Sequence, residues 1–170
     1  MAVYWVTGLS GAGKTTIGWK YYLHLKSTLD NVVFLDGDEL REVLGGDFGY
    51  ELQDRKKLAY CYARISKMLS DQGIHVVIAT ISMFNEVREW NRNNIDNYVE
   101  IYIKVPIEIL IERDQKHIYS NNEKNIVGFN INMEEPINPD IVILNDGLSS
   151  PEMLVSEIIS ALRNKDKQFK

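Results

Sequence analysis

The stretch Ala2-Val-Tyr-Trp-Val-Thr-Gly8-Leu-Ser-Gly-Ala-Gly-Lys14-Thr15 joins a short apolar run to a glycine-rich loop. The run is rich in β-branched and aromatic residues, which is typical of a strand covered on both faces of a parallel sheet. The loop fits the pattern G-x-x-x-x-G-K-[ST] and comes directly before a helical stretch. Glycines let backbone amides wrap around phosphate oxygens, and the following helix presents its positive end to the same anion. The stretch therefore predicts an α/β fold that binds a nucleoside triphosphate.

The two residues that close this loop add side-chain chemistry. The ammonium group of Lys14 is suited to neutralise the β- and γ-phosphates, and the Thr15 hydroxyl is suited to join the shell of a Mg²⁺ ion. A chance glycine-rich turn is the alternative. The flanking strand and helix argue against that alternative, because they are the context in which the pattern works.

Short apolar runs alternate with helical patterns along most of the chain. The expected strands cover residues 2–7, 31–35, 75–79, 99–103 and 140–144. Between them, one helical face carries Leu58, Tyr62, Ile65 and Leu69, Pro106 opens a helix through Arg113, and Pro151 opens a helix with Leu154, Val155, Ile158, Ile159 and Leu162 on its apolar face. This alternation predicts a three-layer fold around a five-stranded parallel sheet, with right-handed crossovers. We expect one domain over residues 1–170.

Composition limits the possible partners. The 170 residues include 19 Lys and Arg against 24 Asp and Glu, a net charge of −5, which argues against a nucleic-acid polymer as partner. The single cysteine, Cys61, excludes a disulfide framework. No apolar stretch approaches the roughly 20 residues needed to cross a bilayer. We therefore expect a cytoplasmic protein without a membrane partner.

Two segments lack a regular pattern. Residues 114–139 are rich in Asn, Lys and Glu and show no sustained helical period. A connection this long inside a small domain is either a functional lid or a passive loop, and we expect a lid. The polar tail, residues 164–170, is expected to fray.

Acidic residues follow the second expected strand rather than the third. The chain lacks the D-x-x-G and N-K-x-D motifs of GTPases, and the strand over residues 75–79 ends without an aspartate. Asp36 and Asp38 instead follow the strand over residues 31–35. A carboxylate there can face the phosphate loop and accept a proton from an attacking hydroxyl. This arrangement is typical of small phosphoryl-transfer kinases. The alternative is that these aspartates cap the helix that begins near Glu39.

Cationic and aromatic residues follow this acidic pair. The guanidinium groups of Arg41 and Arg55 offer forked donors for a phosphate-like or sulfate group. The rings of Tyr50 and Phe129 are suited to stack on a nucleobase. Surface ion pairs for the arginines and packing for the aromatic rings are the alternatives that residue types alone leave open.

Several segments in unbroken order resemble the adenylylsulfate kinase (APS kinase) family, including its cytidine diphosphoramidate kinase branch. They are Gly8-Leu-Ser-Gly-Ala-Gly-Lys-Thr-Thr16, Leu35-Asp-Gly-Asp-Glu-Leu-Arg41, Asp47-Phe-Gly-Tyr-Glu-Leu-Gln-Asp-Arg55, Ala79-Thr-Ile-Ser82, Glu100-Ile-Tyr-Ile-Lys-Val-Pro106, Arg113-Asp-Gln-Lys116, Gly128-Phe129 and Glu135-Pro136. The resemblance implies a P-loop kinase that uses ATP and Mg²⁺ to phosphorylate the 3′-hydroxyl of a small nucleotide. It also implies a homodimer.

The resemblance assigns site residues by their positions in these segments. For ATP they are Gly8, Ser10, Gly11, Ala12, Gly13, Lys14, Thr15, Thr16 and Arg113, with Thr15 on Mg²⁺. For the acceptor they are Asp36, Arg41, Tyr50, Arg55, Ile81, Ser82, Lys116 and Phe129. Asp38 and Lys14 are the expected catalytic residues, with Asp38 as the base or as an anchor for Mg²⁺-bound water.

The acceptor side departs from the family pattern. Leu58 stands where the family has an asparagine, and the arginine expected at Cys61 is absent. An isobutyl group cannot replace the hydrogen bonds of an amide, each worth on the order of 1 kcal/mol. The departures favour an acceptor such as cytidine diphosphoramidate, with adenylylsulfate as the near alternative. A kinase for a sugar or a nucleoside monophosphate, and a nucleotide-binding regulator without catalysis, also stay open.

Overall fold

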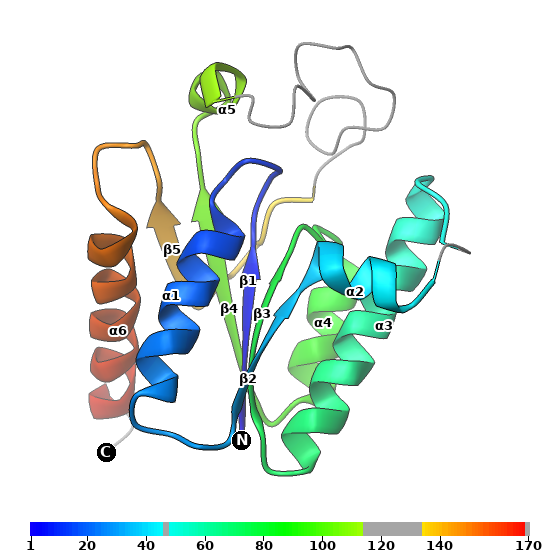
Figure 1. The fold of residues 1–170 in the computed structure, drawn as a ribbon, viewed down its shortest axis with the longest axis horizontal. Coiled ribbons are helices and arrows are strands. Elements are labelled where there is room, and N and C mark those ends of the chain that lie inside the picture. The colour runs from blue at the N-terminus through cyan, green and yellow to red at the C-terminus, as the bar shows by residue number, and fades with distance from the viewer. Residues whose placement is uncertain (46–47, 114–133, 169–170) are drawn as a thin grey trace.

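Five parallel strands form one sheet in the structure, a computed structural model that describes residues 1–45, 48–113 and 134–168 (Figure 1). The strands are β1 (Ala2–Thr7), β2 (Val32–Asp36), β3 (His75–Thr80), β4 (Asn97–Lys104) and β5 (Ile141–Leu144), in the order β2-β3-β1-β4-β5. The predicted α/β class and parallel sheet are confirmed. Thr7 pairs with Thr80 and Asp36 with Ala79, so the segments that follow β1, β2 and β3 leave the sheet at the same edge.

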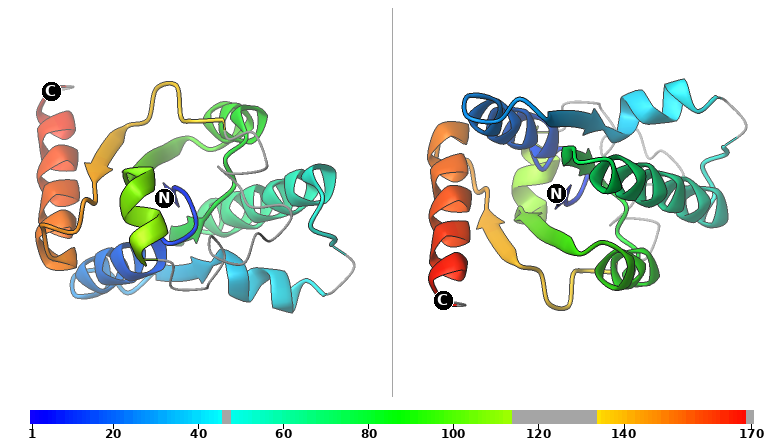
Figure 2. Two further views of the ribbon diagram at one scale, coloured as in Figure 1. Left: turned by 90° about the horizontal axis from the view of Figure 1, so that it is seen from above. Right: turned by 90° about the horizontal axis from the view of Figure 1, so that it is seen from below.

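Helices cover both faces of the sheet, which makes the three expected layers (Figures 1 and 2). Helices α1 (Lys14–Lys26) and α6 (Pro151–Gln168) lie on one face, and α3 (Leu52–Asp71) and α4 (Asn85–Asn94) lie on the other. The short helices α2 (Gly37–Val43) and α5 (Ile107–Arg113) follow β2 and β4. The expected fraying of the tail is wrong for residues 164–168, because α6 continues to Gln168 and Lys165 Nζ donates to Asp140 Oδ1 at 2.7 Å.

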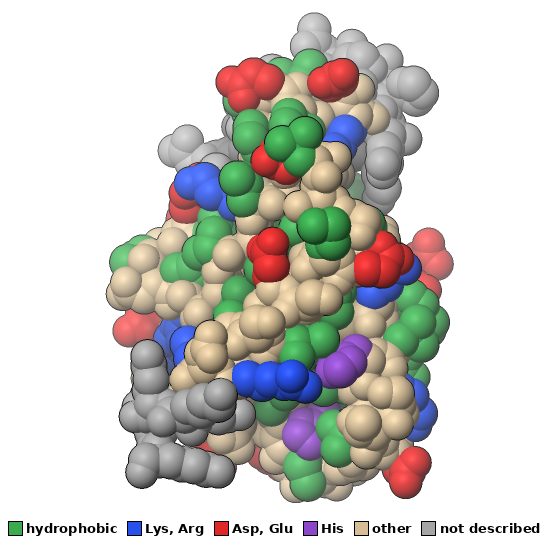
Figure 3. All heavy atoms as spheres, turned by 90° about the vertical axis from the view of Figure 1, so that its left-hand side faces the viewer, with side chains coloured by type: hydrophobic (Ala, Val, Ile, Leu, Met, Phe, Trp, Pro, Cys, Tyr) green, Lys and Arg blue, Asp and Glu red, His purple; other side chains and the backbone are tan. Residues whose placement is uncertain are grey.

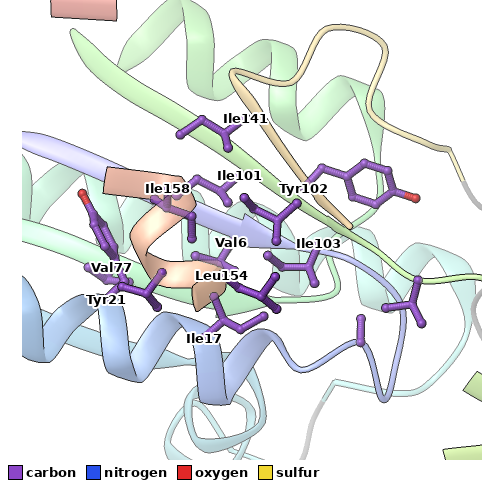
Figure 4. Packing of buried hydrophobic residues seen from close by; sticks show 14 of the residues in the cluster. Val6, Ile17, Tyr21, Val77, Ile101, Tyr102, Ile103, Ile141, Leu154 and Ile158 are labelled. Atoms are coloured by element: carbon purple, nitrogen blue, oxygen red, sulfur yellow. The ribbon is translucent and has the colours of Figure 1, made fainter. Parts of the chain in front are cut away.

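The apolar side chains of α1 and α6 pack together over the centre of the sheet. Ile17 and Tyr21 of α1 meet Leu154 and Ile158 of α6 above Ile101 of β4, and all five side chains are at most 2% exposed (Figure 4). The predicted apolar face of α6 is therefore confirmed at these positions. A second apolar cluster joins α3 and α4 to the other face of the sheet, with Leu58 only 3% exposed.

One buried side chain in the middle of β4 is charged. Glu100 is 2% exposed and pairs with Arg88 Nε at 3.2 Å and with Arg92 Nη2 at 2.7 Å, both from α4. Arg92 Nη1 also contacts Asp140 Oδ2 at 3.1 Å, just before β5. Burial raises the pKa of Glu100 and lowers the pKa of Arg88, since both charged forms lose water. The pairing offsets this cost and attaches α4 to the sheet.

Removing the shared partner of this network should be costly. We expect Glu100→Ala to lower the free energy of unfolding by about 3 kcal/mol, because Arg88 then keeps a buried charge without its counter-ion. Urea unfolding followed by circular dichroism measures the loss. Glu152→Ala is the matched control, since it breaks the exposed pair with Lys20 Nζ at 2.6 Å. Equal losses for the two variants would contradict the buried network's role.

The exterior agrees with the acidic composition. On the face in Figure 3, Lys and Arg side chains are scattered among Asp and Glu side chains. None of the helices in the described part of the chain combines the length and the apolar character that crossing a membrane requires.

Candidate active site

The glycine-rich loop turns sharply between β1 and α1. A side chain at Gly8 would bring its Cβ within 2.5 Å of the Ile103 carbonyl oxygen, so the loop passes directly over the end of β4. Gly13 has φ 88° and precedes the first turn of α1, a backbone conformation that favours glycine. Lys14 is 9% exposed and donates from Nζ to the Leu9 carbonyl at 2.7 Å. The lysine thus lies against the loop itself, with Ser10, Gly11 and Ala12 in the same turn and Thr16 in the first turn of α1.

One carboxylate links this loop to the turn after β2. Asp36 Oδ2 accepts a hydrogen bond from Thr15 Oγ1 at 2.7 Å, and Asp36 Oδ1 accepts one from the Asp38 amide at 2.8 Å. Asp36 is 8% exposed and is the N-cap of α2, so the capping interpretation holds for this aspartate. Asp38 lies in the first turn of α2 and is exposed. The two aspartates therefore have different surroundings, and Asp38 is the one open to solvent.

The turn between the two aspartates packs tightly on the sheet. A Cβ at Gly37 would lie 3.0 Å from Thr80 Oγ1, at the end of β3. Tyr62 of α3 donates from its hydroxyl to the Gly37 carbonyl at 2.6 Å. Burial raises the pKa of Tyr62, and the nearby carboxylates of Asp38 and Asp36 raise it further. The orientation of the turn is thus set by β3 on one side and by α3 on the other.

Two predicted acceptor residues gather on one aromatic ring. The guanidinium carbon of Arg41 lies 4.6 Å from the centre of the Tyr50 ring, and that of Arg55 lies 5.6 Å from it. Arg41 Nη1 donates to the Phe48 carbonyl at 2.9 Å, and Arg55 Nε donates to the Tyr50 carbonyl at 2.8 Å. Burial and the charge of Arg41 lower the pKa of Arg55. Two like charges on one ring make a place where an anion is stabilised.

The residues after β3 border the phosphate loop. Thr7 Oγ1, at the end of β1, donates to the Ile81 carbonyl at 2.6 Å. Ser82 is 7% exposed, has φ 23°, and shares a hydrogen bond of 2.8 Å with Thr80 Oγ1. Ile81 and Ser82 therefore lie at the same edge of the sheet as Gly8.

Asn145, which follows β5, is a further residue of the site that no motif in the sequence singles out. Its Nδ2 donates to the Ala12 carbonyl at 2.9 Å, and Arg113 Nη2 lies 3.3 Å from both Asn145 Oδ1 and the Asn145 carbonyl. Asn145 thus connects Arg113, the predicted ATP-binding residue at the end of α5, to the phosphate loop. The only signal in the sequence is a polar residue directly after a strand, where the carboxyl ends of parallel strands meet.

Other predicted site residues lie outside the described part of the chain. Lys116 and Phe129 are among them, together with residues 114–133 of the expected lid. The structure brings together the phosphate loop, the turn from Asp36 to Asp38, and residues Ile81 and Ser82. Arg41 lies in the same short helix as Asp38, about one turn further along α2.

The described residues suit a Mg²⁺ ion held mainly by a ligand. Within the described ranges, no three His, Cys, Asp or Glu side chains are grouped closely enough to hold a metal alone. Mg²⁺ usually takes one or two protein oxygens together with phosphate oxygens and water. The Thr15 hydroxyl and the Asp36 carboxylate, 2.7 Å apart, are oxygen donors of the kind this ion prefers.

Comparisons with known proteins agree with this geometry. The family model for adenylylsulphate kinase matches residues 1–144. A cytidine diphosphoramidate kinase of Campylobacter jejuni is 45% identical over 164 residues, which cover 94% of this chain and 95% of that protein. An adenylyl-sulfate kinase of Pseudomonas aeruginosa is 37% identical over 168 residues, covering 95% of this chain and 85% of that protein.

A solved structure adds evidence from three dimensions. The Mycobacterium tuberculosis APS kinase CysC, in complex with AMPPNP and APS, superposes with a TM-score of 0.85 at 26% identity. The match covers 95% of this chain and 97% of that one. The sheet, the phosphate loop and the matched sequence lead to one conclusion, that the chain belongs to the adenylylsulphate kinase family.

Proposed function

We propose that the chain is an ATP-dependent kinase that transfers the γ-phosphoryl group to the 3′-hydroxyl of a small nucleotide, with cytidine diphosphoramidate as the first candidate acceptor. The observation that carries the proposal is the 2.7 Å hydrogen bond between Thr15 and Asp36. It places the turn that bears Asp38 beside the loop where the phosphates of ATP would bind.

On the ATP side, the loop amides and Lys14 bind the β- and γ-phosphates. Thr15, with Asp36 beside it, would hold Mg²⁺. When bound, the ion neutralises charge on the phosphate oxygens. Gly8, Ser10, Gly11, Ala12, Gly13, Thr16 and Arg113 complete the proposed ATP site.

On the acceptor side, the carboxylate of Asp38 accepts the proton of the 3′-hydroxyl. The hydroxyl oxygen then forms its bond to the γ-phosphorus while the bond between that phosphorus and the bridging oxygen breaks, and ADP leaves. Arg41 and Arg55 bind the anionic end of the acceptor, and Tyr50 contacts its base. Asp36, Ile81 and Ser82 border the acceptor in this proposal, and Lys116 and Phe129 stay predicted contacts.

The choice of acceptor rests on similarity and on one position in α3. The relative named cytidine diphosphoramidate kinase is 45% identical, against 37% for the Pseudomonas adenylyl-sulfate kinase. Leu58, where the family pattern has an asparagine, is 3% exposed and packs in the apolar cluster of α3. The chain therefore lacks the amide that the family pattern has at this position, and this difference is our reason to expect a changed acceptor. Adenylylsulfate is the second candidate because the family model, the Pseudomonas relative and the Mycobacterium structure are all named for adenylylsulfate kinases.

A panel of acceptors tests the proposal. The purified chain is incubated with ATP and Mg²⁺ and with cytidine diphosphoramidate, adenylylsulfate, cytidine monophosphate or gluconate in turn. We expect ADP release and a new phosphomonoester signal in ³¹P NMR with cytidine diphosphoramidate. Transfer to adenylylsulfate alone would select the second candidate. Transfer only to gluconate or the monophosphate would overturn the proposal, and ATP binding without transfer to any acceptor would favour a regulator.

The family resemblance also implies a homodimer, and the sequence led us to expect a cytoplasmic location. Both belong to this proposal, as does a lid function for residues 114–139.

A further inference from the structure

Asn145 lies between two predicted ATP contacts that come from different parts of the chain. Its side-chain amide donates to the Ala12 carbonyl at 2.9 Å, and its side-chain oxygen lies 3.3 Å from Arg113 Nη2. Its backbone amide donates to the Lys104 carbonyl at 2.8 Å, which continues the pairing of β5 with β4. This backbone bond fixes the position of Asn145 at the end of the sheet, from where its side chain contacts the loop.

The surrounding backbone leaves little room for these groups to move. A Cβ at Gly13 would lie 2.9 Å from Asn145 Nδ2, so the amide rests directly against the loop. On the other side, a Cβ at Gly147 would lie 2.9 Å from Arg113 Nη2. The phosphate loop, Asn145 and Arg113 therefore form one continuous contact chain.

We propose that Asn145 is a positioning residue for ATP, which holds the phosphate loop and Arg113 at a set separation. The inference rests on the proposed function. An amide is suited to this task because it donates through nitrogen and accepts through oxygen at the same time. A nucleotide that contacts both the loop and Arg113 binds best when the two are held in advance, because binding then orders fewer groups.

Two variants separate this role from simple electrostatics. Asn145→Asp keeps the shape and the acceptor for Arg113 but loses the donor to the Ala12 carbonyl, which then faces a carboxylate oxygen. Asn145→Ala removes both side-chain contacts and adds no charge. Both variants keep the backbone bond to Lys104, so the pairing of β5 is retained. Asp146→Asn is the control, because the Asp146 carboxylate accepts from the Leu148 amide and an asparagine oxygen does the same.

The test is the dissociation constant of MgATP, measured by isothermal titration calorimetry without an acceptor. We expect both Asn145 variants to bind ATP about 10-fold more weakly than the wild type, equal to about 1.4 kcal/mol, and the control to match the wild type. In the kinase assay, KM for ATP should rise while kcat and KM for the acceptor change less than about threefold. The thermal unfolding midpoint of both variants should stay near that of the wild type, whereas a purely structural role of Asn145 would lower it.

The outcomes separate the inference from the proposed function. If the wild type fails to bind ATP, the proposed function is wrong. If the wild type binds ATP and both variants bind it equally well, only the positioning role is wrong. Weakening by Asn145→Asp alone would also overturn it, since repulsion between the new carboxylate and the phosphates would then account for the effect.

Discussion

Lys14→Ala is expected to lower kcat by about 10³-fold, which corresponds to a loss of about 4 kcal/mol of transition-state stabilisation. The ammonium group lies against the phosphate loop, where Lys14 Nζ is 2.7 Å from the Leu9 carbonyl oxygen. The residue as a whole is 9% exposed. In the proposed function, a charge held in this position stabilises the negative charge that moves onto the leaving phosphate, and alanine supplies none. Steady-state turnover of ATP with the acceptor found in the panel measures the change.

The control for this variant is Lys20→Ala, which removes a lysine from the same helix. Lys20 pairs with Glu152 at the surface and lies away from the loop, so its loss should leave kcat within about twofold. Circular dichroism of both variants checks that α1 stays folded. Near-normal turnover by Lys14→Ala would discard the assignment of the loop to the γ-phosphate.

Asp38→Asn is expected to lower kcat by about 10²- to 10⁴-fold while the dissociation constant of ATP changes less than about twofold. The amide has the shape of the carboxylate but cannot accept the proton of the attacking hydroxyl. Asp38 is exposed, and the capping of α2 depends on Asp36, so the helix should stay intact. Single-turnover kinetics measure the chemical step, and calorimetry measures ATP binding.

Glu39→Gln provides the comparison, since it makes the same chemical change at an exposed position one residue further along α2. Its turnover should match the wild type. If Asp38→Asn instead weakened ATP binding strongly and left kcat at saturating ATP unchanged, Asp38 would belong to the metal and nucleotide site rather than to the acceptor.

The regular parts of the fold were predictable because their signals are local. The apolar run over residues 2–7 is β1 without any change of bounds, and Pro106 and Pro151 stand at the starts of α5 and α6. Helix α4 was not predicted, because its buried side includes Arg88 and Asn91 in place of a full apolar stripe. This buried side is polar because Arg88 pairs with Glu100 of the following strand, a contact that forms only when the chain folds.

The same contrast holds for the candidate site. The phosphate loop and the pair Asp36 and Asp38 are short motifs, so the sequence was enough to place them at one edge of the sheet. Which aspartate is the cap required coordinates, since it is the Asp38 amide that donates to Asp36 Oδ1. The contact between Thr15 and Asp36, 21 residues apart, was equally out of reach of the sequence. Asn145 acts on Ala12 across 133 residues, and no spacing rule connects an asparagine after a strand to a loop that distant.

The carboxylate of Asp36 also fixes the distance between the starts of two helices, α1 and α2. Its two oxygens sit on one rigid planar group, and each touches a different helix, Thr15 of α1 and the first turn of α2. Two long side chains could change rotamers and let the two helices move apart. The two oxygens of one carboxylate have a fixed separation, so they do not allow this. Side-chain length at position 36 is therefore constrained as strictly as charge. A glutamate there would keep the charge but would shift the two oxygens relative to Thr15 and the Asp38 amide.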